Sequence, residues 1–249
     1  MEKLLLQTAP GVQTQVWFAN QGPKLAVFHH GVPKPRPLTT EELAAFAEFG
    51  YSVACPVRGG YLESTAHQPQ PMAADSATTA NVVSQLGFDS FLTFGFSGGG
   101  PRALADLALN TAVTGGACFG SVAAAKLDFD YYGSFPPEEA EMFQALQDQG
   151  MLMLPMFQEW AASSPDLNVG AEGWICDELA KLADWGFDLG DIHKPCLLFT
   201  SEADQNVPAS HSRWIADKVA NSVILEVPNT QHDDLINPDT IRTALQRLS

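Results

Sequence analysis

The stretch FLTFGFSGGGPRALADL, residues Phe91 to Leu107, joins a short apolar run to a helical pattern through a cluster of small residues. The apolar run is typical of a buried strand, and the Ala and Leu spacing after Pro101 is typical of a helix, since proline is tolerated in a first turn. Between the two, Gly95, Ser97 and Gly99 form the pattern Gly-x-Ser-x-Gly. This junction either only turns the chain or holds the Ser97 hydroxyl out for chemistry.

Outward from the junction, apolar runs typical of buried strands alternate with helical patterns. These runs stand at residues 24–31, 51–57, 91–96, 113–121, 194–204 and 222–229. Thr39 and Glu42 have the spacing of a helix capping box, and Asn237, which precedes a proline, is expected to cap the last helix. The alternation predicts a mostly parallel sheet with helices on both faces, and residues 2–8 and 12–19 are expected to add an antiparallel pair at one edge.

Residues 122–190 interrupt this alternation, because they hold no clear strand and several helical patterns rich in Met, Trp and Phe. A structureless loop of that length is uncommon in a compact domain. We therefore predict a core formed by residues 1–121 and 191–249, with residues 122–190 inserted as a helical cap. Its apolar side chains either line a substrate pocket, with Met153, Phe157 and Trp160 favoured, or only pack the insertion itself; the wider set is Met151, Met153, Met156, Phe157, Trp160 and Trp174.

The chain is strongly acidic, with 13 Lys and Arg against 29 Asp and Glu, a net charge of −16 and a pI near 4.5. Such a surface repels phosphate backbones and anionic lipid headgroups. We therefore expect a small-molecule substrate, and neither nucleic acid nor a membrane as a partner; a homodimer is left open. The insertion alone has thirteen acidic residues and two lysines, which either disfavours anionic substrates or only makes a solvated face.

The sequence lacks the patterns of membrane segments, signal peptides and cysteine-based metal sites. No run of 18 apolar residues is present, and the opening MEKLLLQTAP is too short and polar for the apolar region of a signal peptide, so a cytoplasmic location is expected. The four cysteines lack the Cys-x-x-Cys spacing of metal sites. Cys55, Cys118 and Cys196 lie in apolar runs, where buried thiols are ordinary, and no metal site is expected.

Ser97 has the sequence context of a nucleophile. A serine on a tight strand-to-helix turn has a strained backbone, and glycine at positions 95 and 99 avoids collisions two residues to either side. The amides at the start of the following helix would stabilise an oxyanion. The alternative is that residues 98–100 form only a flexible turn and Ser97 is incidental.

A serine hydroxyl needs a base that a carboxylate orients. His232 is favoured among the six histidines because it follows the last predicted strand, at the strand ends where catalytic groups of such sheets gather. Asp204 is favoured as the acid because it stands just past a strand, 28 residues before His232, although it could also serve only a turn. Glu202, Asp233 and Asp234 compete, but a direct neighbour of His232 reaches the far ring nitrogen poorly.

An oxyanion needs two amide donors, for which Gly98 and Val32 are the candidates. Gly98 directly follows Ser97, and Val32 follows the strand that ends in VFHHG. Gly31 would let the backbone approach closely. Alternatively, the HGVP stretch forms only a turn at the end of a strand.

Together these segments resemble the α/β-hydrolase superfamily, particularly its small cap-bearing esterases, lipases and prolyl-iminopeptidase-like members. The matching pieces are HHGVP, FGFSGGGPRALA, SEADQNVP and QHDDL, in the family's order, and PVRGGYLES loosely resembles the family's Arg-Gly turn. The resemblance implies an eight-stranded, mostly parallel sheet, a helical cap after the sixth strand, and hydrolysis through an acyl-enzyme without a cofactor. Serine rather than aspartate at position 97 disfavours epoxide hydrolases and haloalkane dehalogenases.

The resulting hypothesis is a carboxylesterase-like serine hydrolase that cleaves a small, largely apolar ester or amide. Ser97 would be the nucleophile, His232 the base and Asp204 the acid that orients it. One alternative is an aminopeptidase of the prolyl iminopeptidase type, which needs an acidic pocket for a free amino terminus. Another is a hydrolase-fold receptor or regulator that binds a small molecule without turnover, and lyase or perhydrolase chemistry is also compatible with such a triad.

Overall fold

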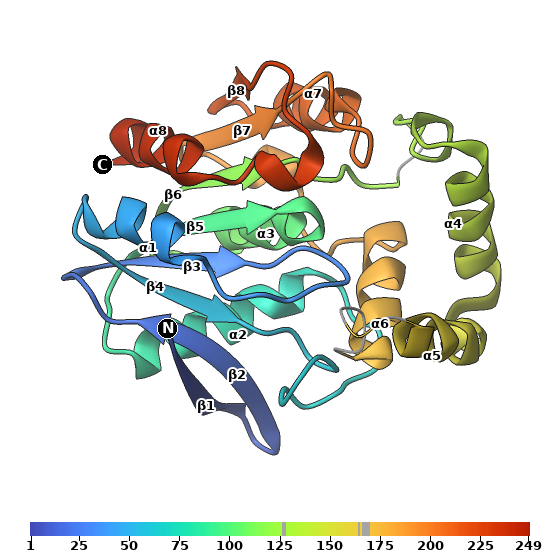
Figure 1. The fold of residues 1–249 in the computed structure, drawn as a ribbon, viewed down its shortest axis with the longest axis horizontal. Coiled ribbons are helices and arrows are strands. Elements are labelled where there is room, and N and C mark those ends of the chain that lie inside the picture. The colour runs from blue at the N-terminus through green and yellow to red at the C-terminus, as the bar shows by residue number, and fades with distance from the viewer. Residues whose placement is uncertain (126–127, 164, 166–169) are drawn as a thin grey trace.

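One mixed sheet organises the chain in the computed structural model, which describes residues 1–125, 128–163, 165 and 170–249. Its strands are β1 (Glu2–Ala9), β2 (Val12–Ala19), β3 (Lys24–His29), β4 (Tyr51–Pro56), β5 (Phe91–Phe96), β6 (Val113–Phe119), β7 (Cys196–Thr200) and β8 (Ser222–Glu226). Within the described residues they form an eight-stranded sheet in the order β1-β2-β4-β3-β5-β6-β7-β8 (Figure 1). The pairs β1–β2 and β2–β4 are antiparallel and all later neighbours are parallel, which confirms the predicted sheet and its edge pair.

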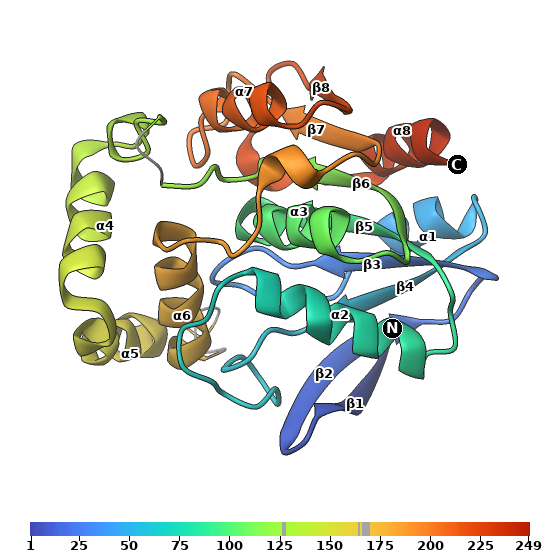
Figure 2. The same ribbon diagram turned by 180° about the vertical axis from the view of Figure 1, so that it is seen from behind.

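Helices cover both faces of this sheet, which explains why the parallel strands are continuous apolar runs. In β3, Leu25 and Val27 face one core whereas Ala26 and Phe28 face the other, as the two-residue period of a strand requires. The first core is covered by α2 (Ala73–Gln85), α3 (Gly100–Leu109) and α7 (Ala209–Lys218), and the second by α1 (Thr40–Ala47) and α8 (Pro238–Leu248). Figure 1 views the molecule from the side of α1 and α8, and Figure 2 from the side of α2 and α3.

Side-chain caps set the first turns of α1 and α8. The Oγ1 atom of Thr39 accepts the N–H of Glu42 at 3.2 Å, and Oε2 of Glu42 accepts the N–H of Thr39 at 2.7 Å. The Oδ1 atom of Asn237 accepts the N–H groups of Asp239 at 2.9 Å and Thr240 at 3.0 Å. Both predicted caps are therefore present, and the second fixes where the chain enters α8 after the last strand.

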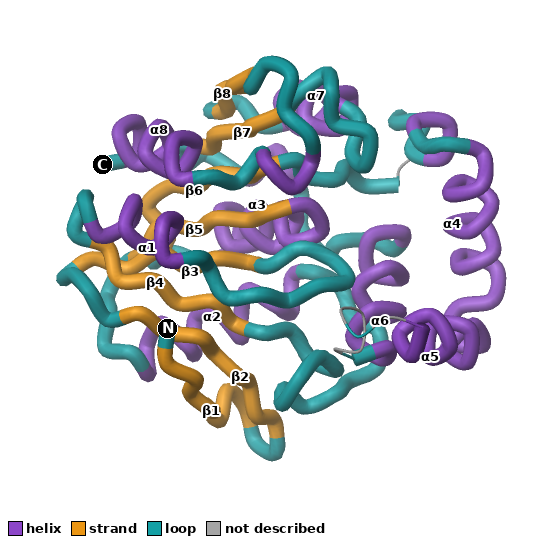
Figure 3. Tube along the Cα trace, in the orientation of Figure 1, coloured by secondary structure: helices purple, strands orange, loops and turns teal. Residues whose placement is uncertain are grey.

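Residues 122–190 leave the sheet after β6 and return before β7. Their described part contains no strand and holds α4 (Pro137–Gln149), α5 (Leu154–Ser163) and α6 (Ala171–Leu182). These helices share a small core of their own, which includes Phe143, Leu146, Phe157 and Ile175. Figure 1 shows them beyond the sheet edge where the parallel strands end, and Figure 3 shows the loops after β3 and β4 extending towards α6. Lys126 and Asp166, which enter the expected charge of this segment, lie outside the described residues.

Candidate active site

Ser97 stands on the tight turn between β5 and α3. Its φ angle of 53° lies in the left-handed region, which is unusual for a residue with a side chain and persists only where the surroundings enforce it. Those surroundings are neighbouring backbones. A Cβ atom on Gly99 would lie 2.2 Å from the carbonyl oxygen of His29, and one on Gly95 would lie 2.4 Å from the carbonyl oxygen of Gly99. Close packing therefore requires glycine at both positions of the pattern.

Asp204 and His232 form a buried pair at the ends of β7 and β8. The Nδ1 atom of His232 lies 2.7 Å from Oδ2 of Asp204, and the two residues are only 6% and 5% exposed. The other carboxylate oxygen accepts the N–H groups of Asn206 and Val207, each at 2.9 Å. Because a carboxylate only accepts, the neutral His232 ring carries its hydrogen on Nδ1, and Nε2 is the basic nitrogen.

The other acids near His232 in sequence are placed differently. Glu202 is largely exposed and pairs with Arg213. Asp233 and Asp234 follow His232 in one short 3₁₀ turn. The structure thus brings Asp204, and not Glu202, to the ring of His232.

A cavity of about 460 Å³ brings the predicted nucleophile and base together. Ser97, His232 and Val32 all line it. The rings of Phe96 and His232 lie with their centroids 4.9 Å apart, which seats the histidine against the residue before Ser97. A Cβ atom on Gly98 would come within 2.5 Å of Cγ2 of Val32, so the two candidate oxyanion donors are neighbours.

Aromatic side chains of the helical segment form part of the cavity wall. Phe157, Trp160 and Trp174 line it, and their ring centroids lie 5.0, 5.2 and 5.8 Å apart in pairs. Met153 is absent from the described lining, and its side chain packs in the core of the helical segment. Two of the three favoured pocket residues therefore reach the cavity, and Trp174 joins them.

Charged side chains of both signs also line the cavity. They are Lys34, Glu139, Glu178, Lys181 and Asp233. Glu178 and Lys181 are ion-paired one turn apart on α6 and are nearly buried. Burial raises the pKa of the Glu139 carboxyl above its ordinary value. The acidic composition of the segment therefore does not translate into a uniformly acidic cavity.

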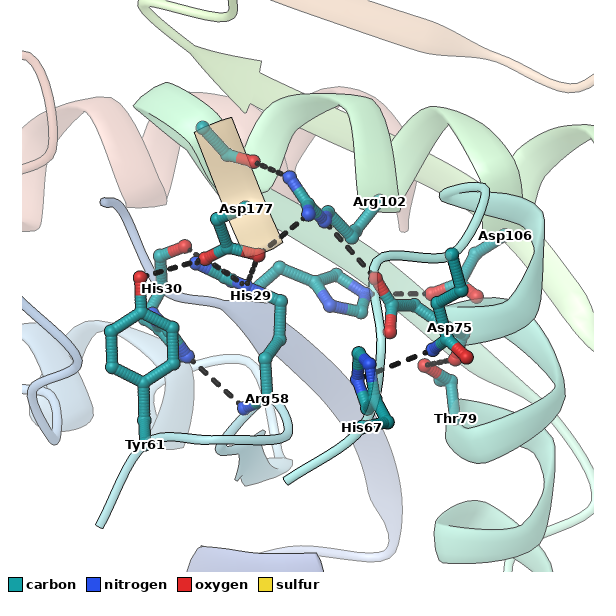
Figure 4. A network of polar contacts seen from close by, with 12 residues as sticks. His29, His30, Arg58, Tyr61, His67, Asp75, Thr79, Arg102, Asp106 and Asp177 are labelled. Carbon is teal, nitrogen blue, oxygen red and sulfur yellow. Dashed lines mark hydrogen bonds and ion pairs between the residues drawn. The ribbon is translucent and has the colours of Figure 1, made fainter. Parts of the chain in front are cut away.

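A buried polar network that the sequence analysis missed joins α6 to the core (Figure 4). Asp177 of α6 accepts hydrogen bonds from Nε of Arg58 at 2.8 Å and from Nη2 of Arg102 at 2.7 Å. Burial alone would raise the pKa of Asp177, but the two guanidinium groups hold it below its ordinary value. Arg58 lies in the PVRGG stretch after β4, yet the two arginines are 119 and 75 residues from Asp177, so no local pattern indicates their pairing.

Three other histidines are buried elsewhere. Nε2 of His29 lies 2.7 Å from Oδ2 of Asp106. Burial and the charge of Arg58 lower the pKa of His30 well below its ordinary value, and burial lowers the pKa of His211 to about 4. Among the described lining residues of the cavity, His232 is the single histidine.

The remaining sequence expectations concern thiols, metals and membranes. The four cysteines are free and buried, and burial raises the pKa of Cys55 to about 12. In the described part of the chain, no three or more His, Cys, Asp or Glu side chains are grouped as metal ligands. No helix among the described residues combines the length and apolarity needed to cross a bilayer.

This chain is similar to known proteins in its three-dimensional structure. No known family model and no curated protein matches the sequence. A bromoperoxidase from Bacillus anthracis is similar with a TM-score of 0.76 and 16% sequence identity, over 99% of both chains. An esterase from Exiguobacterium antarcticum has a TM-score of 0.75 and 19% identity, over 98% of this chain and 97% of its own. An alpha/beta hydrolase fold protein from Nakamurella multipartita has a TM-score of 0.67 and 18% identity, over 99% of both chains. The strand order, the strained turn at Ser97 and these likenesses together show that the chain has the fold of the α/β-hydrolase superfamily.

Proposed function

We propose that this protein is a serine hydrolase that cleaves a small, largely apolar ester or amide through an acyl-enzyme. The observation that carries the proposal is the buried pair of His232 and Asp204, 2.7 Å apart, on the same cavity as the strained Ser97. A basic Nε2 atom and a nearby hydroxyl on a rigid turn are the two parts that activation of a serine requires. The named esterases among similar structures support hydrolysis in general.

In the proposed reaction, Oγ of Ser97 attacks the substrate carbonyl carbon while its proton passes to Nε2 of His232. The negative charge that develops on the carbonyl oxygen would be held by the N–H groups of Val32 and Gly98. When the intermediate collapses, the alcohol or amine leaves with the proton from His232. Water then attacks the acyl-enzyme with His232 again as the base, which releases the acid and restores the serine.

The cavity supports a small substrate with apolar parts. Its volume of about 460 Å³ lies in the lower part of the range for small-molecule sites. The aromatic wall comes from Phe157 on α5 and Trp174 on α6, so residues 122–190 would act as a cap over the substrate. Burial of aromatic surface favours apolar acyl or alcohol groups over strongly hydrated ones.

A second candidate, an aminopeptidase, rests on the carboxylates in the cavity. Glu139 and Glu178 both line it; because Glu178 is paired with Lys181, Glu139 is the group that would hold a free amino terminus. Kinetics on 4-nitrophenyl butyrate and on proline 4-nitroanilide separate the two candidates. Faster turnover of the ester favours the esterase, and faster turnover of the aminoacyl amide favours the aminopeptidase.

The proposal is tested by the intact mass of the protein after treatment with a fluorophosphonate probe. We expect one adduct on the wild type and on Ser84→Ala, whose serine is exposed on α2. We expect none on Ser97→Ala and at least a 100-fold slower reaction of His232→Ala, since the loss of a general base costs about 10²–10⁴ in rate. A folded wild type without an adduct would contradict the proposal and favour a receptor that binds without turnover.

A further inference from the structure

Arg58 connects α6 to the loop after β3 (Figure 4). Its Nη1 atom donates to the carbonyl oxygen of His30 at 2.7 Å, and Nη2 donates to that of Gly31 at 3.0 Å. The carbonyl of Gly31 and the N–H of Val32 belong to one planar peptide group. Fixing the direction of this oxygen, which also lies 2.7 Å from Nδ1 of His30, therefore fixes the direction of the Val32 N–H. A charged donor on the carbonyl also polarises the peptide and strengthens its N–H as a donor.

Arg102 makes a second, less direct connection to the turn that carries Ser97. Its Nη1 atom donates to the carbonyl oxygen of Gly98 at 2.7 Å, and its Nη2 atom donates to Asp177 at 2.7 Å. Glycine has the widest backbone freedom of any residue, so its orientation depends on such outside contacts. This carbonyl lies in the peptide group after Gly98, so anchoring it restricts the ψ rotation of Gly98 and limits how the residue that carries the second expected donor can move.

Asp177 holds both guanidinium groups at once. Its side chain is 6% exposed, and those of Arg58 and Arg102 are 6% and 2% exposed. Tyr61 donates a further hydrogen bond to it at 3.0 Å. Without this carboxylate, two buried positive charges would lose their shared counter-charge and repel each other. Arg102 also pairs with Asp75 at 3.1 Å, so Asp177 is the carboxylate that the two arginines share, and Arg58 depends on it more than Arg102 does.

We propose that Asp177 is a positioning residue for the oxyanion hole, acting through Arg58 and Arg102 on the amides of Val32 and Gly98. The inference rests on the proposed function, because it assigns these amides to a developing oxyanion. It also couples the helical segment to the chemistry, since α6 carries Trp174 and Glu178 of the cavity wall beside Asp177. A substrate that shifts α6 would thereby change the alignment of the donors.

The test compares an ester with its thionoester, in which sulfur replaces the carbonyl oxygen. Sulfur is a weak hydrogen-bond acceptor, so the thionoester gains little from oxyanion amides. Asp177→Asn should lower kcat/KM for the ester at least tenfold, because removing one such donor costs about 10²–10³ in kcat. The loss should fall mainly on kcat, and kcat/KM for the thionoester should change little, so the ester-to-thionoester ratio falls.

Asp106→Asn is the matched control. Asp106 is an equally buried carboxylate, but it pairs with His29 and with neither arginine, so its substitution should leave the ratio unchanged. Arg58→Lys keeps a buried cation but cannot bridge Asp177 and two carbonyls, so it should lower the ratio and serves if Asp177→Asn does not fold. Equal losses for both substrates in a folded Asp177→Asn or Arg58→Lys variant would overturn the proposal.

A wild type that hydrolyses neither substrate would overturn the proposed function instead. The positioning of the peptide is then measured by the backbone amide signal of Val32 in NMR spectra. Arg58→Lys should shift this signal more than Asp106→Asn does. An equal or smaller shift in Arg58→Lys would overturn the positioning role independently of turnover.

Discussion

At the scale of single residues, the backbone conformation of Ser97 lowers the free energy of unfolding. A left-handed φ angle costs a residue with a side chain roughly 1–2 kcal/mol, and Ser97 has a φ angle of 53°. Glycine adopts this conformation freely but loses about 0.5–1 kcal/mol more in conformational entropy on folding. Ser97→Gly should therefore raise the free energy of unfolding by about 0.5 kcal/mol while it abolishes probe labelling. Urea denaturation followed by circular dichroism measures the change.

Ala80→Gly is the matched control for this prediction. Ala80 is exposed in the middle of α2, where glycine relieves no strain. Its substitution should lower the free energy of unfolding by about 1 kcal/mol. If both variants lost stability equally, Ser97 would not be strained.

Residues of the site were predictable from the sequence where their pattern is local. Gly95, Ser97 and Gly99 lie within five positions of one another, and their steric reason acts over the same short distance. Asp204 and His232 are 28 residues apart, but each follows a strand, and parallel strands end at one edge. The geometry of the sheet therefore brings Asp204 and His232 together although they are far apart in the sequence.

At the scale of elements, His211 joins α7 to the beginning of the helical segment. Its Nδ1 atom accepts the N–H of Ala123 at 2.9 Å, and its Nε2 atom lies 2.9 Å from Oγ of Ser134. Since Nδ1 accepts, the ring is neutral and carries its hydrogen on Nε2. Burial lowers the pKa of His211 from its ordinary value of 6.5 to about 4. Protonation of the ring at low pH would remove the acceptor for the N–H of Ala123.

The free energy of unfolding should consequently fall between pH 6.5 and pH 4. Over this range the unfolded chain binds a proton at position 211 that the folded protein excludes; above it neither state binds the proton, and below it both do. A pKa shift of this size corresponds to a loss of roughly 3 kcal/mol at most. Urea denaturation at several pH values should show a shallower fall in His211→Gln than in the wild type.

The exposed His193 provides the control, because His193→Gln should keep the slope of the wild type. Burial also lowers the pKa of His30, so His211→Gln retains part of the fall. A fall as steep in His211→Gln as in the wild type would contradict the role of the buried ring.

Elements were less predictable in the helical segment than in the sheet. Buried strands can be recognised in the sequence as apolar runs. The apolar residues of α4 to α6 are instead divided between a small core and a cavity wall. Both environments accept Met and aromatic side chains, so the sequence pattern does not distinguish the wall from the core, where Met153 lies. The pairing of Asp177 with Arg58 depends on tertiary structure alone. In the sequence, Asp177 is therefore indistinguishable from the other acidic residues of the segment.

At the scale of the whole molecule, the net charge of −16 sets the long-range field around the cavity. This field should slow the encounter with anionic substrates, and salt should weaken it, because the Debye length falls from about 30 Å at 0.01 M to about 3 Å at 1 M. If the protein hydrolyses esters, the 4-nitrophenyl hemiester of succinate should have a several-fold lower kcat/KM than neutral 4-nitrophenyl valerate at 0.01 M salt. The gap should narrow at 1 M salt.

Charged residues that line the cavity could outweigh the long-range repulsion of an anionic substrate, and that result would contradict the prediction. Lys34 and Lys181 line the cavity together with three carboxylates, so short-range attraction and long-range repulsion of an anion compete. Salt screens the distant charges on the surface more than the buried pair of Lys181 and Glu178. A hemiester preferred at low salt would mean that the two lysines dominate the field at the reacting carbonyl. Lys34→Gln should then reduce the preference, and the substrate class would change from apolar to anionic esters.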